Sequence, residues 1–269
     1  MGKRELFALV AIPFLLVTIL WFPPWVFLAV LGTAILLAGD EMLSMARGAG
    51  FDTGRWLPLA VLAAVLAASW IWNVVGLAVA AVAVPLILST ARLAHPASPT
   101  GSFGGVAASS YAVLFLGTTG ACFGWLRLWP GDQQGVRILL FFLACIWVGD
   151  SGAYYVGKTF GRHKMSPRIS PNKTWEGLAG GVLTAYAAAA VAATMLHLSL
   201  GLVHTAALAT VLAAAAPLGD LVESQLKRDS GVKDSSTLLP GHGGFLDRTD
   251  SLLYAAPPVL GYLLAAGLL

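Results

Sequence analysis

The distribution of apolar residues constrains this chain most. Nine apolar segments follow one another along its 269 residues, and several reach the roughly 18 residues at which an apolar run becomes a candidate transmembrane helix. Only 11% of the residues are charged, against roughly a quarter in a soluble domain. The period-two alternation of a transmembrane barrel is absent. The sequence therefore predicts an all-α, polytopic integral membrane protein. Its predicted helices are 6–22, 25–39, 57–72, 74–90, 106–126, 137–157, 177–199, 202–219 and 252–269.

The positions of the basic residues predict an orientation. Cytoplasmic loops of membrane proteins carry an excess of Lys and Arg. A cytoplasmic N-terminus puts the basic loops 158–176 and 220–251 on the inner side and leaves only Arg127 and Arg137 outside. The prediction is about nine spans with the C-terminus on the opposite side, because eight spans would separate the two basic loops. The first segment also resembles a signal peptide, but a second apolar run follows with no small-residue cleavage site, which favours a retained helix.

Composition also excludes some classes of protein. The net charge of +3 comes with no basic tail or stripe, so no nucleic-acid partner is expected. Cys122 and Cys145 lie inside apolar runs and are interpreted as small buried side chains. We expect short turns at Pro23–Pro24 and Trp72–Asn73. The predicted organisation is an N-terminal region of about five transmembrane helices, 1–135, and a C-terminal catalytic region, 136–269.

The charged residues are concentrated in two windows. More than half of the 16 Lys and Arg and 13 Asp and Glu residues lie in 150–176 and 220–250. Both windows face the cytoplasm in the predicted topology. Two loops that are far apart in sequence but share one face can build one site.

The second window begins as a helix. Asp220, Glu223 and Lys227 are spaced i, i+3 and i+7, so they share one helical face, with Ser224 and Arg228 beside them. One interpretation is a solvated helix end with local ion pairs. The other is a functional site, because Asp220 directly adjoins the apolar run and a carboxylate at membrane depth is costly.

The sequence LLPGHGGFLDRTDS follows. Gly241, Gly243 and Gly244 allow a tight turn whose N–H groups offer a phosphate cradle, and His242 lies within this turn. Asp247 and Asp250 begin the next helix, where capping is the alternative role. Capping does not require six acids and four bases within this window. Carboxylates hold hard metal ions and cations hold phosphate oxygens, so the set suits Mg²⁺-dependent phosphate chemistry.

The first window combines an acid with a basic tract. Asp150 lies near the end of an apolar run, where burial of its charge is expensive. Ser170 and Lys173 lie in the basic tract that follows. This tract suits a polyphosphate ligand; contact with anionic lipid headgroups is the alternative.

At these residues the chain resembles the phosphatidate cytidylyltransferase (CDP-diacylglycerol synthase) family. The segments SPNKTWEG (170–177) and GDSGAYYVGKTFGRHK resemble further blocks of that family. The likeness covers the C-terminal half, and the first 135 residues match only as apolar helices. In 224–250, the positions that fit the family's pattern are Ser224, Lys227, Arg228, Lys233, Asp234, Pro240, His242, Gly243, Gly244, Asp247, Arg248 and Asp250.

The resemblance implies a reaction: CTP and phosphatidic acid give CDP-diacylglycerol and pyrophosphate, a step of phospholipid biosynthesis. It also implies Mg²⁺, with a second metal ion such as K⁺ left open, and often a homodimer. The location expected is a bacterial inner (plasma) membrane, with the active site on the cytoplasmic side.

Roles follow for individual residues. The metal ligands expected from the resemblance are Asp220 and Asp247, with Asp150, Glu223 and Asp250 as further ligands or outer partners. Ser170, Ser224 and His242 are expected to bind phosphate or orient ligands, with His242 as general acid an alternative. The residues expected to neutralise the phosphates of CTP and lipid are Lys173, Lys227, Arg228, Lys233 and Arg248.

Other functions stay open at this point. Another CTP-dependent lipid enzyme, such as a prenol kinase or an ether-lipid CDP synthase, would share the membrane setting and the nucleotide. A transporter would also carry intramembrane acids, although paired broken helices in two related halves would then be expected.

Overall fold

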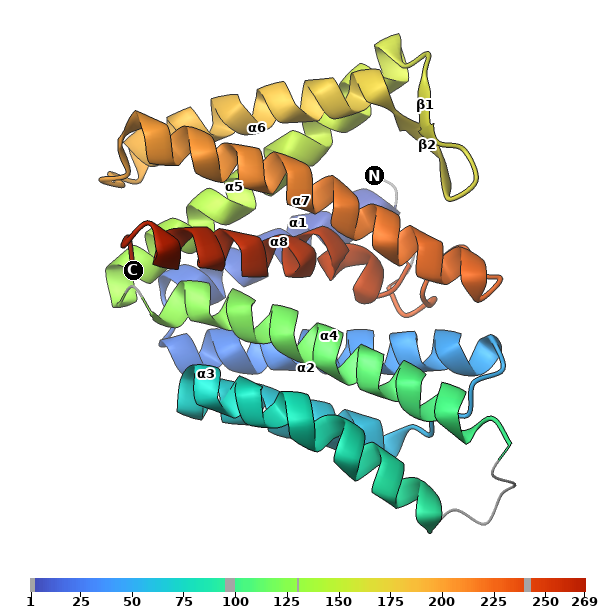
Figure 1. The fold of residues 1–269 in the computed structure, drawn as a ribbon. Coiled ribbons are helices and arrows are strands. Elements are labelled where there is room, and N and C mark those ends of the chain that lie inside the picture. The colour runs from blue at the N-terminus through green and yellow to red at the C-terminus, as the bar shows by residue number, and fades with distance from the viewer. Residues whose placement is uncertain (1–2, 95–99, 130, 240–242) are drawn as a thin grey trace. The chain divides into compact units, whose positions relative to one another are not determined.

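The fold was analysed in a computed structural model, which describes residues 3–94, 100–129, 131–239 and 243–269 (Figure 1). The described residues form helices and one small antiparallel sheet, so the predicted all-α class holds apart from that sheet. The elements are α1 (Lys3–Leu20), α2 (Pro24–Gly48), α3 (Trp56–Leu93), α4 (Ser102–Leu128), α5 (Asp132–Phe160), β1 (Lys164–Ser166), β2 (Ser170–Thr174), α6 (Trp175–Met195), α7 (Gly201–Asp229) and α8 (Leu246–Ala265).

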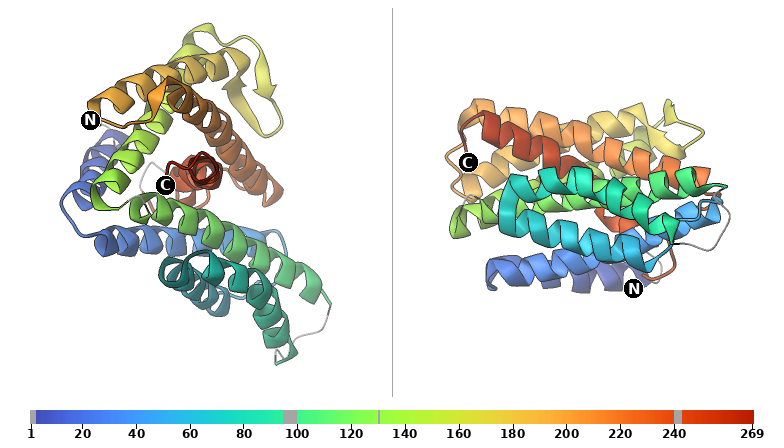
Figure 2. Two further views of the ribbon diagram at one scale, coloured as in Figure 1. Left: turned by 60° about the vertical axis from the view of Figure 1, so that its left-hand side comes forward. Right: turned by 60° about the horizontal axis from the view of Figure 1, so that its bottom comes forward.

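The 38-residue α3 consists of two helices. Asn73 has non-helical dihedrals (φ 53°, ψ −136°), and Asn is among the residues that adopt positive φ most readily. The two halves fold back side by side (Figure 2). A Cβ at Gly76 would lie 2.3 Å from the carbonyl oxygen of Ala68, so the close return requires glycine there. The turn predicted at Trp72–Asn73 is confirmed.

Six helices of the described chain, α2 to α7, are long and apolar enough to cross a bilayer. Large apolar side chains are exposed on them, as expected where lipid replaces water. Tryptophans lie exposed near helix ends, including Trp25 at 69%, Trp56 at 75% and Trp72 at 65%. Interfacial aromatic side chains occupy such positions in membrane proteins. The structure is that of a membrane protein built mainly of helices.

The chain divides into two compact units. Unit 1 comprises residues 1–124 and 226–249, and unit 2 comprises 125–225 and 250–269. The described residues of 226–249 group with the N-terminal helices. Helices α4, α7 and α8 each pass from one unit to the other.

In unit 1, helices α2, α3 and α4 form an apolar core. Phe27, Ile35, Leu62 and Leu116 are almost fully buried, and the Phe27 ring meets Phe123 edge to face at 6.1 Å. Lipid is as apolar as these side chains, so they stabilise the packing of membrane helices through van der Waals contact. The core holds the C-terminal end of α2 in place.

In unit 2, the predicted loop 158–176 contains a β-hairpin. β1 pairs with β2 antiparallel, with Lys164 opposite Thr174. The Thr174 side chain accepts a hydrogen bond of 3.1 Å from the N–H of Gly177 and so caps α6. Glu176 accepts from the backbone N–H groups of Arg162 and His163, which ties the start of the hairpin to α6.

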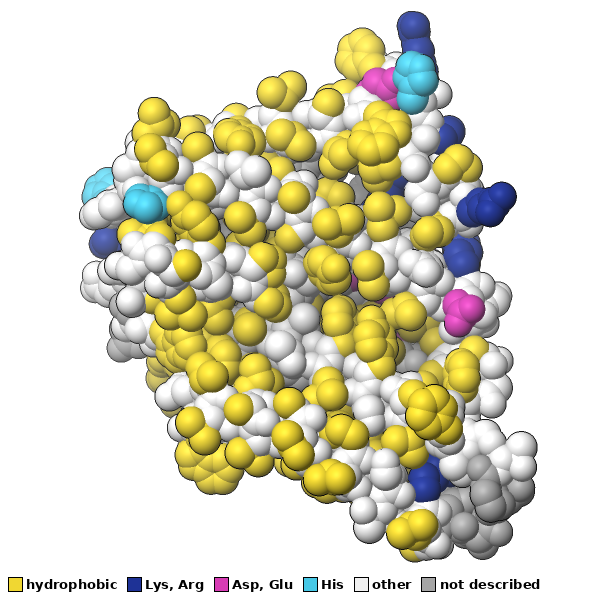
Figure 3. Space-filling view, viewed as in Figure 1, with side chains coloured by type: hydrophobic (Ala, Val, Ile, Leu, Met, Phe, Trp, Pro, Cys, Tyr) yellow, Lys and Arg dark blue, Asp and Glu magenta, His cyan; other side chains and the backbone are white. Residues whose placement is uncertain are grey.

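Hydrophobic side chains cover much of the visible face of α6 and α7, and Lys and Arg side chains gather at the end that carries β1 and β2 (Figure 3). Leu183, Leu202 and Val203 on these helices are 70%, 84% and 75% exposed. The two cysteines, Cys122 and Cys145, are free and buried, as predicted. Unit 2 thus combines an apolar surface, of the kind that faces lipid, with a basic end near the hairpin.

Candidate functional site

Three carboxylates converge in unit 2. Asp220 and Glu223 lie on α7 and Asp250 lies on α8, and one oxygen from each falls within 4.8 Å of the others. Glu223 is only 5% exposed. The helical spacing already put Asp220 and Glu223 on one face, and the structure adds Asp250 from a second helix.

Gly219 explains how Asp250 reaches this position. A Cβ at Gly219 would lie 2.8 Å from the Asp250 carbonyl oxygen and 2.6 Å from the Tyr254 Cβ. Any residue other than glycine at position 219 would therefore prevent the α8 backbone from coming this close to α7. Close helix approach at small residues is typical of membrane helices.

A lysine from the hairpin pairs with this cluster. The Lys173 ammonium lies 2.9 Å from Asp220 Oδ2 and also donates to the Pro217 carbonyl oxygen at 3.3 Å. Ser224 Oγ donates to Asp220 Oδ1 at 3.2 Å. Asp220 thus contacts a cation through one oxygen and a hydroxyl through the other, while its side chain stays 42% exposed.

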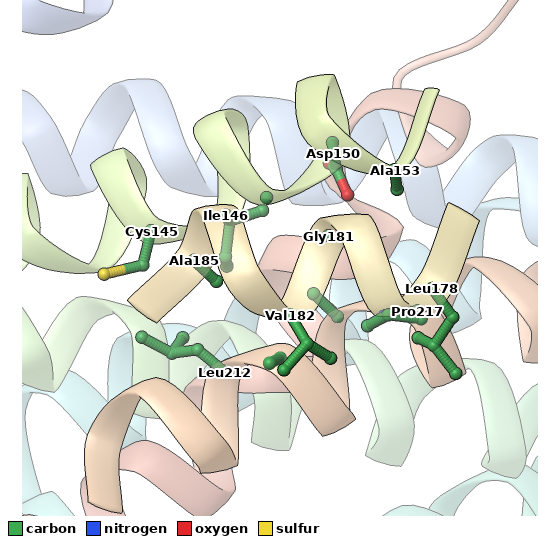
Figure 4. Close-up of a pocket in the computed structure, with 13 residues that line it drawn as sticks. Cys145, Ile146, Asp150, Ala153, Leu178, Gly181, Val182, Ala185, Leu212 and Pro217 are labelled. Carbon is green, nitrogen blue, oxygen red and sulfur yellow. The ribbon is translucent and has the colours of Figure 1, made fainter. Parts of the chain in front are cut away.

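A further acid of unit 2, Asp150, lines a small cavity between α5, α6 and α7. Asp150 lines it together with apolar side chains that include Ile146, Val182 and Leu212 (Figure 4). Its volume of about 30 Å³ suffices for about one water molecule. Asp150 is the one charged residue among the described residues that line this cavity.

The donor set in unit 2 fits a hard cation. Its ligand atoms are carboxylate oxygens, the donors that Mg²⁺ and Ca²⁺ prefer. Carboxylates this close repel one another when ionised, and a bound cation relieves that repulsion. Lys173 supplies a positive charge to Asp220, one of the three acids.

A second charged cluster lies in unit 1, around Asp247. The Lys227 ammonium donates to Asp247 Oδ1 at 2.5 Å, and the side chains are 10% and 5% exposed. Asp247 Oδ2 accepts from the N–H of Gly244 at 2.7 Å and from the N–H and Oγ of Ser235 at 2.9 and 2.7 Å. Burial alone would raise the pKa of Asp247, but the hydrogen bonds from Gly244, Lys227 and Ser235 outweigh it and lower the pKa to about 2.

Glu41 on α2 is a site residue that the sequence reasoning missed. It is 6% exposed and accepts hydrogen bonds from Ser236 Oγ at 2.6 Å, Ser235 Oγ at 3.1 Å, Leu246 N at 2.8 Å and Phe245 N at 3.0 Å. One signal was present in the sequence: Glu41 lies one residue after the end of an apolar run, next to Asp40.

The remaining predicted residues have different surroundings. The N–H of Gly244, which the glycine pattern offered to phosphate, donates to Asp247, and Gly243 adopts the positive φ of 78° that favours glycine. Ser170 is partly buried on β2. His242 lies outside the described residues. Among the residues of unit 1 predicted to bind phosphate, Arg228, Lys233 and Arg248 are exposed.

The apolar helices define a helical membrane protein, and the acids of unit 2 offer it donors that suit a hard cation. The chain matches the model of the cytidylyltransferase family over residues 2–266 and belongs to that family.

Several similar proteins share the name phosphatidate cytidylyltransferase. A phosphatidate cytidylyltransferase of Bacillus subtilis is 44% identical over 147 residues, 54% of this chain and 54% of that protein. Those of Haemophilus influenzae and Mycobacterium leprae are 44% and 46% identical over 131 and 136 residues. These cover 46% and 51% of this chain and 44% and 43% of the relatives. The chain thus spans about half the length of the relatives it matches.

Proposed function

We propose that the protein transfers the cytidylyl group of CTP to phosphatidic acid, giving CDP-diacylglycerol and pyrophosphate. The observation that carries this proposal is the group of three carboxylates, Asp220, Glu223 and Asp250, with Lys173 paired to Asp220. Membership in the cytidylyltransferase family and the name shared by the relatives support the choice of substrates.

The reaction asks for positioning and charge stabilisation more than for a base. A phosphate oxygen of phosphatidic acid forms a bond to the α-phosphorus of CTP, and the bond from that phosphorus to the bridging oxygen of pyrophosphate breaks. The lipid phosphate is largely ionised at neutral pH, since its second pKa is about 6. Two polyanions must therefore meet, and the leaving pyrophosphate must be stabilised.

Residues of unit 2 suit the need to bring two polyanions together. Asp220, Glu223 and Asp250 would hold Mg²⁺, which when bound would neutralise charge at the α-phosphate of the cytidylyl group being transferred. Lys173, now held by Asp220, is placed to exchange that carboxylate for a phosphate oxygen. Ser224 orients Asp220 through its hydroxyl.

Residues of unit 1 divide into two groups. Arg228, Lys233 and Arg248 have exposed side chains and stay assigned to substrate phosphates. Lys227 and Asp247 neutralise each other in a buried pair, which suits them to holding the segment in shape. This assignment moves the metal from Asp247 to the acids of unit 2.

The proposal includes the membrane topology. Nine spans, with the N-terminus in the cytoplasm and the C-terminus opposite, put both basic loops at the cytoplasmic surface of the plasma membrane. Phosphatidic acid presents its headgroup at that surface, and CTP arrives there from water. Cysteines placed one at a time in the loop 49–55 and at the C-terminus, then labelled from one side with an impermeant thiol reagent, test this topology.

The reaction is tested with purified protein in detergent. CTP and phosphatidic acid are supplied with Mg²⁺ or with EDTA, and pyrophosphate and CDP-lipid are measured. We expect pyrophosphate release that requires both substrates and the metal. Release of CDP with a prenol acceptor would identify a kinase instead. CTP consumption with an ether lipid alone would mean that the lipid substrate is an ether lipid and not phosphatidic acid. No nucleotide consumption with any acceptor would overturn the enzymatic function.

A further inference from the structure

The Glu41 carboxylate holds two separate stretches of the chain. Its partners lie 194 to 205 residues further along the sequence. Ser235 and Ser236 donate through their hydroxyl groups, and Phe245 and Leu246 donate through their backbone N–H groups. A buried carboxylate with four donors is fully satisfied, and such a charge-assisted network is stronger than its neutral counterpart.

Gly244 fits directly against this carboxylate. A Cβ at Gly244 would lie 2.3 and 2.4 Å from the two Glu41 oxygens and 2.1 Å from Ser235 Oγ. Glycine is therefore required by the position of Glu41. Ser235 and Gly244 are also the residues whose N–H groups bind Asp247, so the two carboxylates hold the same backbone from two sides.

We infer that Glu41 is a positioning residue, which fixes Ser235–Ser236 and Phe245–Leu246 so that Asp247 meets Lys227 and the flanking cations reach the nucleotide. This role rests on the proposed function. In the proposed reaction, Glu41 itself contacts no reacting atom. Glu41 acts through the backbone N–H groups and serine hydroxyls that it binds. It lies on α2, in the N-terminal half, where the sequence resembled the family only in having apolar helices.

The test compares Glu41→Gln with Asp40→Asn. Both changes remove one negative charge at adjacent positions of α2. Asp40 instead binds the exposed Arg55 guanidinium at 2.7 and 2.8 Å, outside the cluster. Amide hydrogen exchange is followed in peptides that contain Phe245 and Leu246, and the KM for CTP is measured on the folded fraction. Ser236→Ala removes one Glu41 bond and serves as a milder variant should Glu41→Gln not fold.

We expect exchange in Glu41→Gln to be at least about tenfold faster, the factor that follows from losing one charge-assisted hydrogen bond. The KM for CTP should rise by a similar factor, while Asp40→Asn changes neither. Unchanged exchange overturns the inference. Faster exchange with an unchanged KM also overturns it, because a merely structural role lowers only the amount of active protein. If the wild type releases no pyrophosphate, the proposed function fails, and the exchange comparison alone decides whether Glu41 holds the segment.

Discussion

The Lys227 ammonium and the Asp247 carboxylate form an ion pair at 2.5 Å in which neither side chain is more than 10% exposed. The sequence suggested that Lys227 binds phosphate and Asp247 binds metal. In the structure the two side chains are engaged with each other, and Oδ2 of Asp247 accepts three hydrogen bonds. A buried pair of this kind costs desolvation but is expensive to break from one side.

Replacing only one partner should therefore destabilise more than replacing both. Lys227→Met leaves the Asp247 charge buried, and we expect a loss of about 3 kcal/mol in the free energy of unfolding. Adding Asp247→Asn should restore part of that loss, since the neutral amide needs no counter-ion. Chemical denaturation in detergent measures both. Arg228→Met, at an exposed neighbour, should stay within about 0.5 kcal/mol. Equal losses in the single and double variants would contradict a coupled pair.

The lowered pKa of Asp247 gives a second prediction with a definite sign. A carboxyl whose pKa falls from 3.8 unfolded to about 2 folded stabilises the fold above the unfolded value, and that stability is lost as pH falls toward 2. The stability difference between the wild type and Asp247→Asn should be constant from pH 5 to pH 8 and shrink below about pH 4. Thermal unfolding across this range measures it. A difference that changes between pH 5 and pH 8 would mean that Asp247 titrates there.

Local sequence patterns were sufficient for much of this fold. The helices follow from long apolar runs, and the return at Asn73 follows from a polar residue between two of them. Asp220 and Glu223 share a face because helical spacing alone decides it. These features depend only on residues within a few positions of one another.

Contacts between distant residues were beyond sequence reasoning. Glu41 binds residues about 200 positions away, and no local pattern specifies that pairing. Asp250 joins the acids because Gly219 admits its backbone, which is a property of helix packing. The hairpin was missed because its two strands span only three and five residues. Its attachment depends on Glu176 and on Lys173 reaching Asp220.

Loss of a carboxylate from unit 2 should weaken metal binding. Asp220→Asn removes one charge from the acid cluster, and we expect the Mg²⁺ concentration for half-maximal activity to rise at least about tenfold. Stability should change little, because the Asp220 side chain is 42% exposed. Titration of EDTA-treated protein with Mg²⁺ gives the value. Asp229→Asn, an exposed acid on the same helix, is the matched control. An unchanged half-saturation in Asp220→Asn would remove this residue from the metal site.

The close approach at Gly219 leads to the sharpest steric prediction. Gly219→Ala places a methyl group 2.6 Å from the Tyr254 Cβ and 2.8 Å from the Asp250 carbonyl, so α8 must move away from α7. Overpacking of this kind costs about 1–3 kcal/mol, and the displacement of Asp250 should raise the Mg²⁺ requirement as Asp220→Asn does. Gly261→Ala on α8 meets no atom within 4 Å and should stabilise the helix by up to about 1 kcal/mol with no effect on Mg²⁺. Thermal unfolding and Mg²⁺ titration of the two variants separate packing from helix propensity. If Gly219→Ala binds Mg²⁺ as the wild type does, Asp250 is not held at the acid cluster by this contact.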